Sequence, residues 1–236
     1  MPRARLLAGL LLASLSVFLM SAKCIENDTV RRGSNNDWTI FGEIHNETDI
    51  QGVEILLRGT IFDDDGNAVG VAQARTCPGE LSPNSIAVYG IRFNESQTVP
   101  QPARHQVNVL SGRAQGEPLP ELEAALSDVS VVEVNGTDLR YRFTYVADEA
   151  YEGGVHGCIA WYDAAGEVVA VSTLLVKGSA AEPGVAVDFD AEHPDYRQEF
   201  GEIAAVRFWV YVDDPDVSVN ASRFQAIMTD KVPIQR

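Results

Sequence analysis

A β-hairpin that occurs twice is the feature that most restricts how this chain can fold. The first copy, residues 53–75, reads VEILLRGTIFDDDGNAVGVAQAR. Alternate positions in its first half are apolar: Val53, Ile55, Leu57 and Ile61. A period of two residues is typical of a strand that is buried on one face. Asp63 and Gly66 supply the turn, because aspartate hydrogen-bonds to its own backbone and glycine adopts positive φ without strain.

The second copy follows one hundred residues later, in the segment VHGCIAWYDAAGEVVAVSTLL. It repeats four residues of the first copy at the same spacing, as Asp163, Gly166, Val169 and Val171. A further turn is repeated in the same register, as Pro83-Asn84 and Pro183-Gly184. Proline fixes φ at the first corner of a type II turn, and asparagine or glycine takes the left-handed conformation at the second. The chain therefore contains two copies of one module.

Short alternating strands without a long helical period predict an all-β fold of two tandem antiparallel β-sandwich domains. A chain of 236 residues is long enough to bury a core in each. We expect the first sandwich over residues 38–112 and a second, divergent sandwich over 129–230. Glycine and proline interrupt residues 113–128, which we interpret as a linker with a short helix.

Residues 38–93 resemble the FxLYD domain, a bacterial and archaeal immunoglobulin-like module. The resemblance rests on FGEIHN at residues 41–46, on Ile61-Phe62-Asp63 in place of Leu-Tyr-Asp, and on a strand ending at Phe93. Gly59 stands where the family has phenylalanine, and the second copy keeps Tyr162-Asp163. The resemblance implies two immunoglobulin-like domains and a location in the cell envelope. It implies no activity and no functional residues.

The N-terminal residues 1–24 have the pattern of an export signal. Arg3 and Arg5 precede an apolar run, and Ser21-Ala22-Lys23-Cys24 ends it. We expect export, with this segment either cleaved or retained as an N-terminal anchor. Cys24 is a candidate lipidation site because the region resembles the lipobox of bacterial lipoproteins, from which Lys23 departs. Residues 25–37 are polar and lack periodicity, so we interpret them as a spacer.

The net charge of the chain restricts which classes of partner it can bind. The net charge of −16 repels phosphate backbones and anionic lipid head groups, which argues against nucleic-acid binding. Membrane contact is therefore expected only through the N-terminal segment. Five asparagines stand in N-x-S/T motifs and are candidate glycosylation sites: Asn27, Asn46, Asn94, Asn135 and Asn220. The alternative is that they are ordinary turn residues.

The most site-like cluster is the first hairpin turn, where Asp63, Asp65 and Asn67 could supply oxygen ligands to calcium. The glutamate that an EF-hand places six residues after its glycine is absent, since position 72 is alanine. The alternative is a hairpin turn with solvated carboxylates. A similar and shorter cluster, Asp213-Asp214-Pro215-Asp216, follows the last long predicted strand.

Cys77 and Cys158 lie one in each module, and they can pair only if the modules fold against each other with Cα atoms within about 7 Å. The sequence leaves that question open. In the repeat alignment Cys158 matches Arg58, on the face opposite Val155 and Trp161, so we expect it to be less buried than its neighbours. Cys158 shares a strand face with His156, which we interpret as packing.

No catalytic or cofactor-binding motif is present. Four histidines occur singly, without the spacing of a zinc site: His45, His105, His156 and His193. The chain contains no G-x-S-x-G motif, Walker A loop or G-x-G-x-x-G loop. We therefore expect no cofactor.

These observations favour a non-enzymatic exported module that binds an envelope or extracellular protein or glycan, or that has a structural role. Aromatic residues that would form a contact surface if they are exposed, and core if they are not, are Trp38, Phe62, Tyr162 and Trp209. Two alternatives are a secreted hydrolase and a calcium-dependent adhesion module that uses the Asp63 turn. The hydrolase requires a cleft between the domains lined by carboxyl groups of raised pKa.

Overall fold

The computed structural model describes residues 25–33, 37–93, 101–115, 117–151, 153–177, 182–194, 196, 201–212 and 224–236. The predicted signal segment with Cys24, the candidate sites Asn94 and Asn220, and the acidic cluster at 213–216 lie outside these residues.

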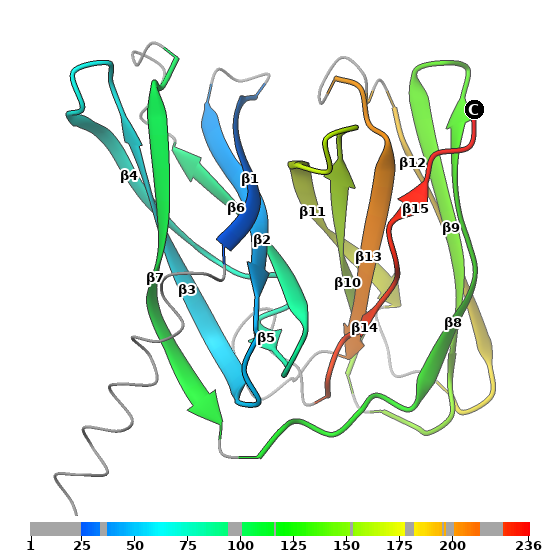
Figure 1. Ribbon diagram of the computed structural model, residues 1–236. Coiled ribbons are helices and arrows are strands. Elements are labelled where there is room, and N and C mark those ends of the chain that lie inside the picture. The colour runs from blue at the N-terminus through cyan, green and yellow to red at the C-terminus, as the bar shows by residue number, and fades with distance from the viewer. Residues whose placement is uncertain are drawn as a thin grey trace, which may run out of the picture.

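All regular elements in the described part of the chain are β-strands, so the predicted all-β class is confirmed. They form four sheets that lie side by side and that we number across the molecule, from left to right in Figure 1. Sheet 1 contains β3 (Gln51–Phe62), β4 (Ala68–Arg75), β5 (Glu80–Leu81) and β7 (Arg104–Gln115). Sheet 2 contains β1 (Ile25–Arg32), β2 (Trp38–His45) and β6 (Ile86–Phe93).

The C-terminal half builds the other two sheets. Sheet 3 contains β10 (Val155–Tyr162), β11 (Val168–Lys177), β13 (Ala205–Val212), β14 (Ile227–Met228) and β15 (Val232–Pro233). Sheet 4 contains β8 (Ala124–Val134), β9 (Asp138–Ala147) and β12 (Ala186–His193). The strand pairs within all four sheets are antiparallel.

The two predicted hairpins are present, as β3–β4 and β10–β11. Gly66 and Gly166 adopt φ values of +82° and +87° at the two turns. The second pair of repeated turns also has the predicted conformation, since Asn84 and Gly184 adopt φ values of +55° and +69°. Local sequence therefore decides both turns in each module.

Two apolar cores lie inside the sandwiches. The core between sheets 1 and 2 includes Ile40, Leu57 and Ile91, none of which is exposed. The core between sheets 3 and 4 includes Phe143, Trp161 and Phe208. Burying a side chain of this size stabilises the fold by about 1.5–3 kcal/mol. A third apolar cluster lies between sheets 2 and 3 and joins the halves.

Several predicted boundaries are wrong. Residues 25–32 of the expected spacer form β1, which pairs with β2. The first module therefore extends beyond 38–112, from β1 to the end of β7 at Gln115. The expected linker helix is absent, because residues 124–128 belong to β8 and Glu121 forms a bridge with Gln225. The second module likewise extends past 129–230, since Gln235 pairs with Val132.

Replacing Gly157 with alanine should destabilise the protein. A Cβ atom at Gly157 would lie 2.7 Å from the backbone oxygen of Trp209, which β-sheet pairing prevents from moving. We expect Gly157→Ala to lower the free energy of unfolding by about 1–3 kcal/mol, measured by chemical denaturation. Gly33→Ala is the control, because its Cβ would approach no neighbouring atom closer than 3.7 Å. Equal stability of the two variants would contradict this packing.

Candidate functional site

The most elaborate polar arrangement in the described residues lies at the junction between sheets 2 and 3. The outer face of sheet 2 contributes Phe41, Ile86 and Val88, and sheet 3 contributes Ala160, Tyr162 and Trp209. Tyr162 and Trp209, which were candidates for an exposed contact surface, are 0% and 1% exposed. These side chains therefore form a closed, apolar contact around the polar groups of the junction.

Continuous apolar runs in the sequence explain why this contact forms. Every residue of β10 from Gly157 to Tyr162 is buried, and so are the last five residues of β13, FWVYV. A strand that is buried on both faces loses the alternation of a half-exposed strand. This loss of alternation was the signal that could have predicted the junction from sequence.

A disulfide bond crosses the junction and links Cys77 to Cys158, with their Cα atoms 5.9 Å apart. Cys158 is completely buried, so the expectation that it would be less buried than its neighbours is wrong. Its face of β10 is covered by sheet 2, whereas the matching face of β3, which carries Arg58, is exposed. In the chain-entropy account, a disulfide across a separation of 81 residues stabilises the folded protein by about 4.5 kcal/mol, because it restricts the unfolded chain.

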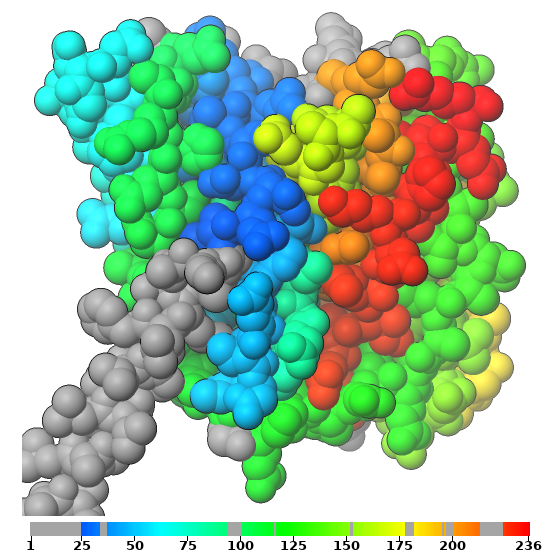
Figure 2. Space-filling view, in the orientation of Figure 1, coloured from blue at the N-terminus to red at the C-terminus, as the bar shows by residue number. Residues whose placement is uncertain are grey.

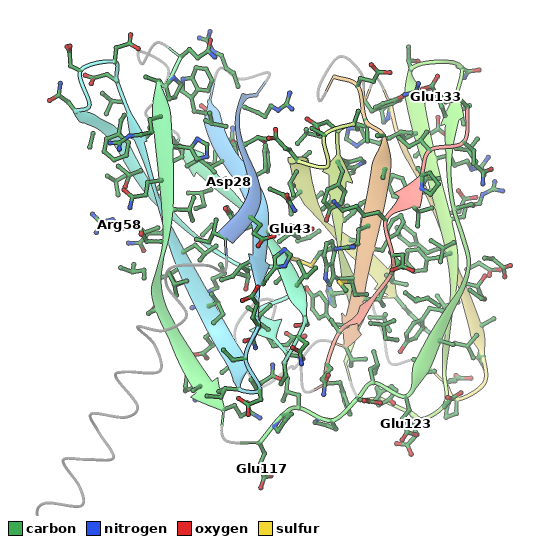
Figure 3. All side chains as sticks on the ribbon, in the orientation of Figure 1. Asp28, Glu43, Arg58, Glu117, Glu123 and Glu133 are labelled. Carbon is green, nitrogen blue, oxygen red and sulfur yellow. A yellow bond between two sulfur atoms is a disulfide. The ribbon has the colours of Figure 1, made fainter. Side chains whose placement is uncertain are left out.

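Glu43 is the buried centre of a polar cluster that we call the Glu43 cluster: Asn27, Glu43, His45, Tyr162 and Arg207. The Glu43 side chain is 1% exposed and points into the junction from β2 (Figure 3). Tyr162 donates a hydrogen bond of 2.6 Å to its Oε1 atom, and Arg207 Nη1 lies 3.4 Å from the same oxygen. Asn27 donates to Oε2, and His45 Nε2 lies 3.3 Å from that oxygen. Both sandwiches therefore supply partners to one carboxylate.

The cluster stabilises the ionised form of Glu43. Burial alone would raise the pKa of Glu43, but hydrogen bonds from His45, Tyr162 and Asn27 outweigh burial and lower it to about 2. The hydrogen bond to Glu43 raises the pKa of His45. Burial, with the negative charge of Glu43, raises the pKa of Tyr162. Glu43 therefore remains charged at neutral pH and is not suited to act as a general acid.

Further contacts cross the junction around this cluster. Trp209 donates its indole hydrogen to the carbonyl oxygen of Ile86 at 2.7 Å, and the Thr29 hydroxyl donates to the carbonyl oxygen of Val168. Arg31 forms an ion pair of 3.3 Å with Asp163, the residue that begins the second hairpin turn. These contacts fix the orientation of one sandwich on the other.

The predicted calcium turn uses its side chains within the turn. Asp63 Oδ1 accepts a hydrogen bond of 2.7 Å from the backbone N–H of Asn67, and Oδ2 accepts one of 3.1 Å from the Asn67 side chain. Within the described part of the chain, no three His, Cys, Asp or Glu side chains come together in a group that could hold a metal ion. The calcium site at Asp63, Asp65 and Asn67 stays a prediction.

The candidate glycosylation sites differ in accessibility. Asn46 is 2% exposed, and its amide donates to the carbonyl oxygens of Ile50, Leu81 and Ser82 at 2.7–3.1 Å. The folded chain therefore offers no access to Asn46, and this candidate is wrong for the native state. Asn27 is exposed, but its amide belongs to the Glu43 cluster. Asn135 lies on an exposed turn with φ of +54°.

The histidines and the remaining aromatic candidates have structural contacts. His105 lies 2.9 Å from Asp28, while His156 and His193 lie against Tyr211 and Trp161. Cys158, which shares a strand with His156, is bonded to Cys77 and is therefore no nucleophile. Trp38 is 5% exposed, and Arg104 covers the ring of Phe62 at 4.2 Å.

One buried carboxyl group was not singled out by the sequence. Glu80 on β5 is 3% exposed, and burial raises its pKa to about 8. Neither of its carboxyl oxygens has a hydrogen-bond partner among the described residues. Glu80 has the raised pKa that a general acid needs, but its carboxyl oxygens do not reach the surface.

Comparisons with known proteins do not assign a family. No family model matches the chain, and no curated protein matches it. A β-glucuronidase from Ruminococcus gnavus is 14% identical over 84% of this chain and 36% of its own, with a TM-score of 0.25. A transglutaminase of red sea bream is 12% identical over 91% and 32%, with a TM-score of 0.27. A β-glucosidase from Listeria innocua is 14% identical over 59% and 20%, also at 0.27.

The chain spans about a third of the length of the first two of these structures. At TM-scores this low, none of the three bears on function. In the residues that the structure describes, no helix is long and apolar enough to cross a membrane.

Removing the charge of Glu43 should loosen the junction. Glu43→Gln leaves Arg207, which is only 12% exposed, beside a neutral amide, and we expect the free energy of unfolding at neutral pH to fall by about 3 kcal/mol. Asp190→Asn is the control, because Asp190 forms exposed ion pairs with Arg140 and Arg142 that are worth less than about 1 kcal/mol.

The same variant should change the response to acid. The folded-state pKa of Glu43 is lowered from 4.5 to about 2, so its contribution is full above pH 4.5 and is lost as pH falls towards 2. Denaturation curves measured across this window should therefore show a smaller loss of stability in Glu43→Gln than in the wild type. Identical curves for the two proteins would contradict the role of the Glu43 cluster.

Proposed function

We propose that this chain is a non-enzymatic, exported protein that acts as a binding or structural module at the cell surface or in the extracellular space. In this proposal two immunoglobulin-like sandwiches, the first of them FxLYD-like, form one rigid unit. Residues 1–24 direct export and provide the contact with the membrane, with lipidation of Cys24 as one means of anchoring.

The observation that carries this proposal is the buried disulfide between the sandwiches. Structural disulfides form and persist in oxidising compartments outside the cytosol and are rare inside it. This bond lies in the buried junction and joins the two halves of the chain covalently. An oxidising compartment agrees with the export pattern at the N-terminus.

The junction gives less support to a hydrolase. Catalysis between the sandwiches would need an open cleft with a carboxyl group able to donate a proton. The junction carboxylate, Glu43, is 1% exposed and has a pKa of about 2. Binding through an outer surface is therefore the function that this geometry favours, and the partner would be an envelope or extracellular protein or glycan.

Export and oxidation should occur together. We expect the full-length chain, produced in a bacterium, to be found outside the cytosol with Cys77 and Cys158 protected from alkylation until a reductant is added. Cell fractionation followed by mass measurement of the alkylated protein would show this. A chain that lacks residues 1–24 is the control and should remain in the cytosol. Recovery of the full-length chain from the cytosol with both thiols free would refute the proposal.

A further inference from the structure

The outer face of sheet 1 points away from the rest of the molecule (Figure 1). Side chains alternate along its strands, so every second residue is directed outward. We call this surface the arginine face, and it consists of Leu56, Arg58, Thr60 and Phe62 on β3, Val71, Gln73 and Arg75 on β4, and Arg104, Gln106, Asn108 and Leu110 on β7. This set contains three arginines and no carboxylate. Carboxylates border it at Glu54, which pairs with Arg113, and at the exposed Asp64 and Asp65 in the β3–β4 turn. In Figure 2 the strands of sheet 1 form the left boundary of the molecule.

These arginines differ from the others that the structure describes. Ion pairs with carboxylates are formed by Arg31, Arg92, Arg113, Arg140, Arg142, Arg207 and Arg236. Among the described arginines, those without such a pair are Arg32, Arg58, Arg75 and Arg104, and three of these four lie on the arginine face. A chain with a net charge of −16 thus leaves positive charge uncompensated in one place.

The three guanidinium groups belong to a diagonal row across adjacent strands. Arg75 lies opposite Leu56, and Arg104 lies opposite Phe62, with Arg58 on the strand between them. Six residues of β3 separate the two ends of the row, which corresponds to about 20 Å along the strand. Figure 3 shows Arg58 pointing outward, away from the junction.

Neutral hydrogen-bonding groups fill the space between the arginines. Gln73 and Asn108 lie on either side of Arg58, and Gln106 lies beside Thr60. Arg58 and Gln73 are exposed, and Val71 is 53% exposed. Amides and hydroxyls both donate and accept hydrogen bonds, as the hydroxyl groups of a sugar require.

We propose that the arginine face binds a linear glycan that carries carboxylate groups. The planar fork of each arginine matches a carboxylate, while the amides between them match sugar hydroxyls. The row of arginines would bind a short extended stretch of such a chain. This inference deepens the proposed function and rests on it, because it names the partner class of an exported binding module.

Charge decides between a glycan and other acidic partners. The Debye length at physiological salt is about 8 Å, so a thin chain on the arginine face responds mainly to the nearby arginines. An anionic membrane is a wide surface, so it would also be repelled by the acidic residues on the rest of the molecule. Single-stranded nucleic acid needs open aromatic rings for stacking, and the ring of Phe62 is covered by Arg104. A second copy would have to present the exposed carboxylates of β12, which are Asp188, Asp190 and Glu192. Asp190 already binds Arg140 and Arg142, and self-association is therefore one of the outcomes that the test below distinguishes.

The test is binding of the purified chain to fluorescently labelled alginate oligosaccharides, measured by anisotropy, with neutral dextran as the comparison polymer. The variant Arg58→Gln/Arg75→Gln/Arg104→Gln removes the charge and keeps hydrogen-bonding amides. The matched control is Arg140→Gln/Arg142→Gln, which makes the same kind of change on sheet 4, where the arginines are already paired.

We expect the wild type to bind alginate and not dextran, and the triple variant to bind at least about tenfold more weakly, because three exposed charge pairs are lost. The control variant should bind like the wild type. Equal binding by the triple variant, equal binding to dextran, or binding to dextran sulfate without binding to alginate would overturn the proposal. Self-association that disappears in the triple variant would also overturn it, in favour of a second copy as partner. None of these outcomes concerns where the chain is located, so export is tested separately.

Discussion

The carboxylate of Glu43 is charged, almost completely out of contact with water, and bonded to groups from both halves of the chain. A buried charge is tolerated when its partners are all in place, and it becomes strongly destabilising when one is removed. Tyr162 and Arg207 reach Glu43 from sheet 3, so these contacts depend on how the two sandwiches are oriented. The Cys77–Cys158 bond joins the two halves covalently, and the apolar faces of sheets 2 and 3 exclude water around the carboxylate. The rest of the structure depends on this junction.

A closed junction determines which surfaces remain for binding. The inner faces of all four sheets are core, and the outer faces of sheets 2 and 3 are buried against each other. The broad strand faces that stay open are therefore the outer faces of sheets 1 and 4. They differ in charge, since Arg140 and Arg142 of sheet 4 are paired with Asp190, whereas Arg58, Arg75 and Arg104 of sheet 1 have no such pair. The two sandwiches thus have the same general design but offer different surfaces to a partner.

The sequence predicted the fold class, the two hairpins and the turns at Asn84 and Gly184, because alternation and turn chemistry are local. It failed where tertiary contacts replace local signals. Strand β1 has no apolar alternation, and the sequence gives no sign of its pairing with β2. A bulge with Asp128 at φ of +53° interrupts β8. Because the bulge breaks the alternation, the sequence pattern assigns the first residues of this strand to the linker. The sequence around Asn46 is typical of a turn, and nothing in it predicts that the Asn46 amide donates to three carbonyl oxygens.

Cys158 shows the limit of reasoning from the repeat. Its match to Arg58 places both residues on the outer face of a hairpin, but the first hairpin belongs to sheet 1, whose outer face is exposed, and the second belongs to the inner sheet 3. The repeat preserves the strand and its faces, and the assembly of the two modules decides which face is buried. The continuous apolar runs of β10 and β13 contained that information.

The central claim is that the two sandwiches form one rigid body. Residual dipolar couplings of backbone amides, measured in a weakly aligned sample of the oxidised protein, test it directly. The account predicts that a single alignment tensor fits the amides of β1–β7 and of β8–β15 together. Two tensors of different magnitude, one for each sandwich, would show that the halves move independently and would contradict it.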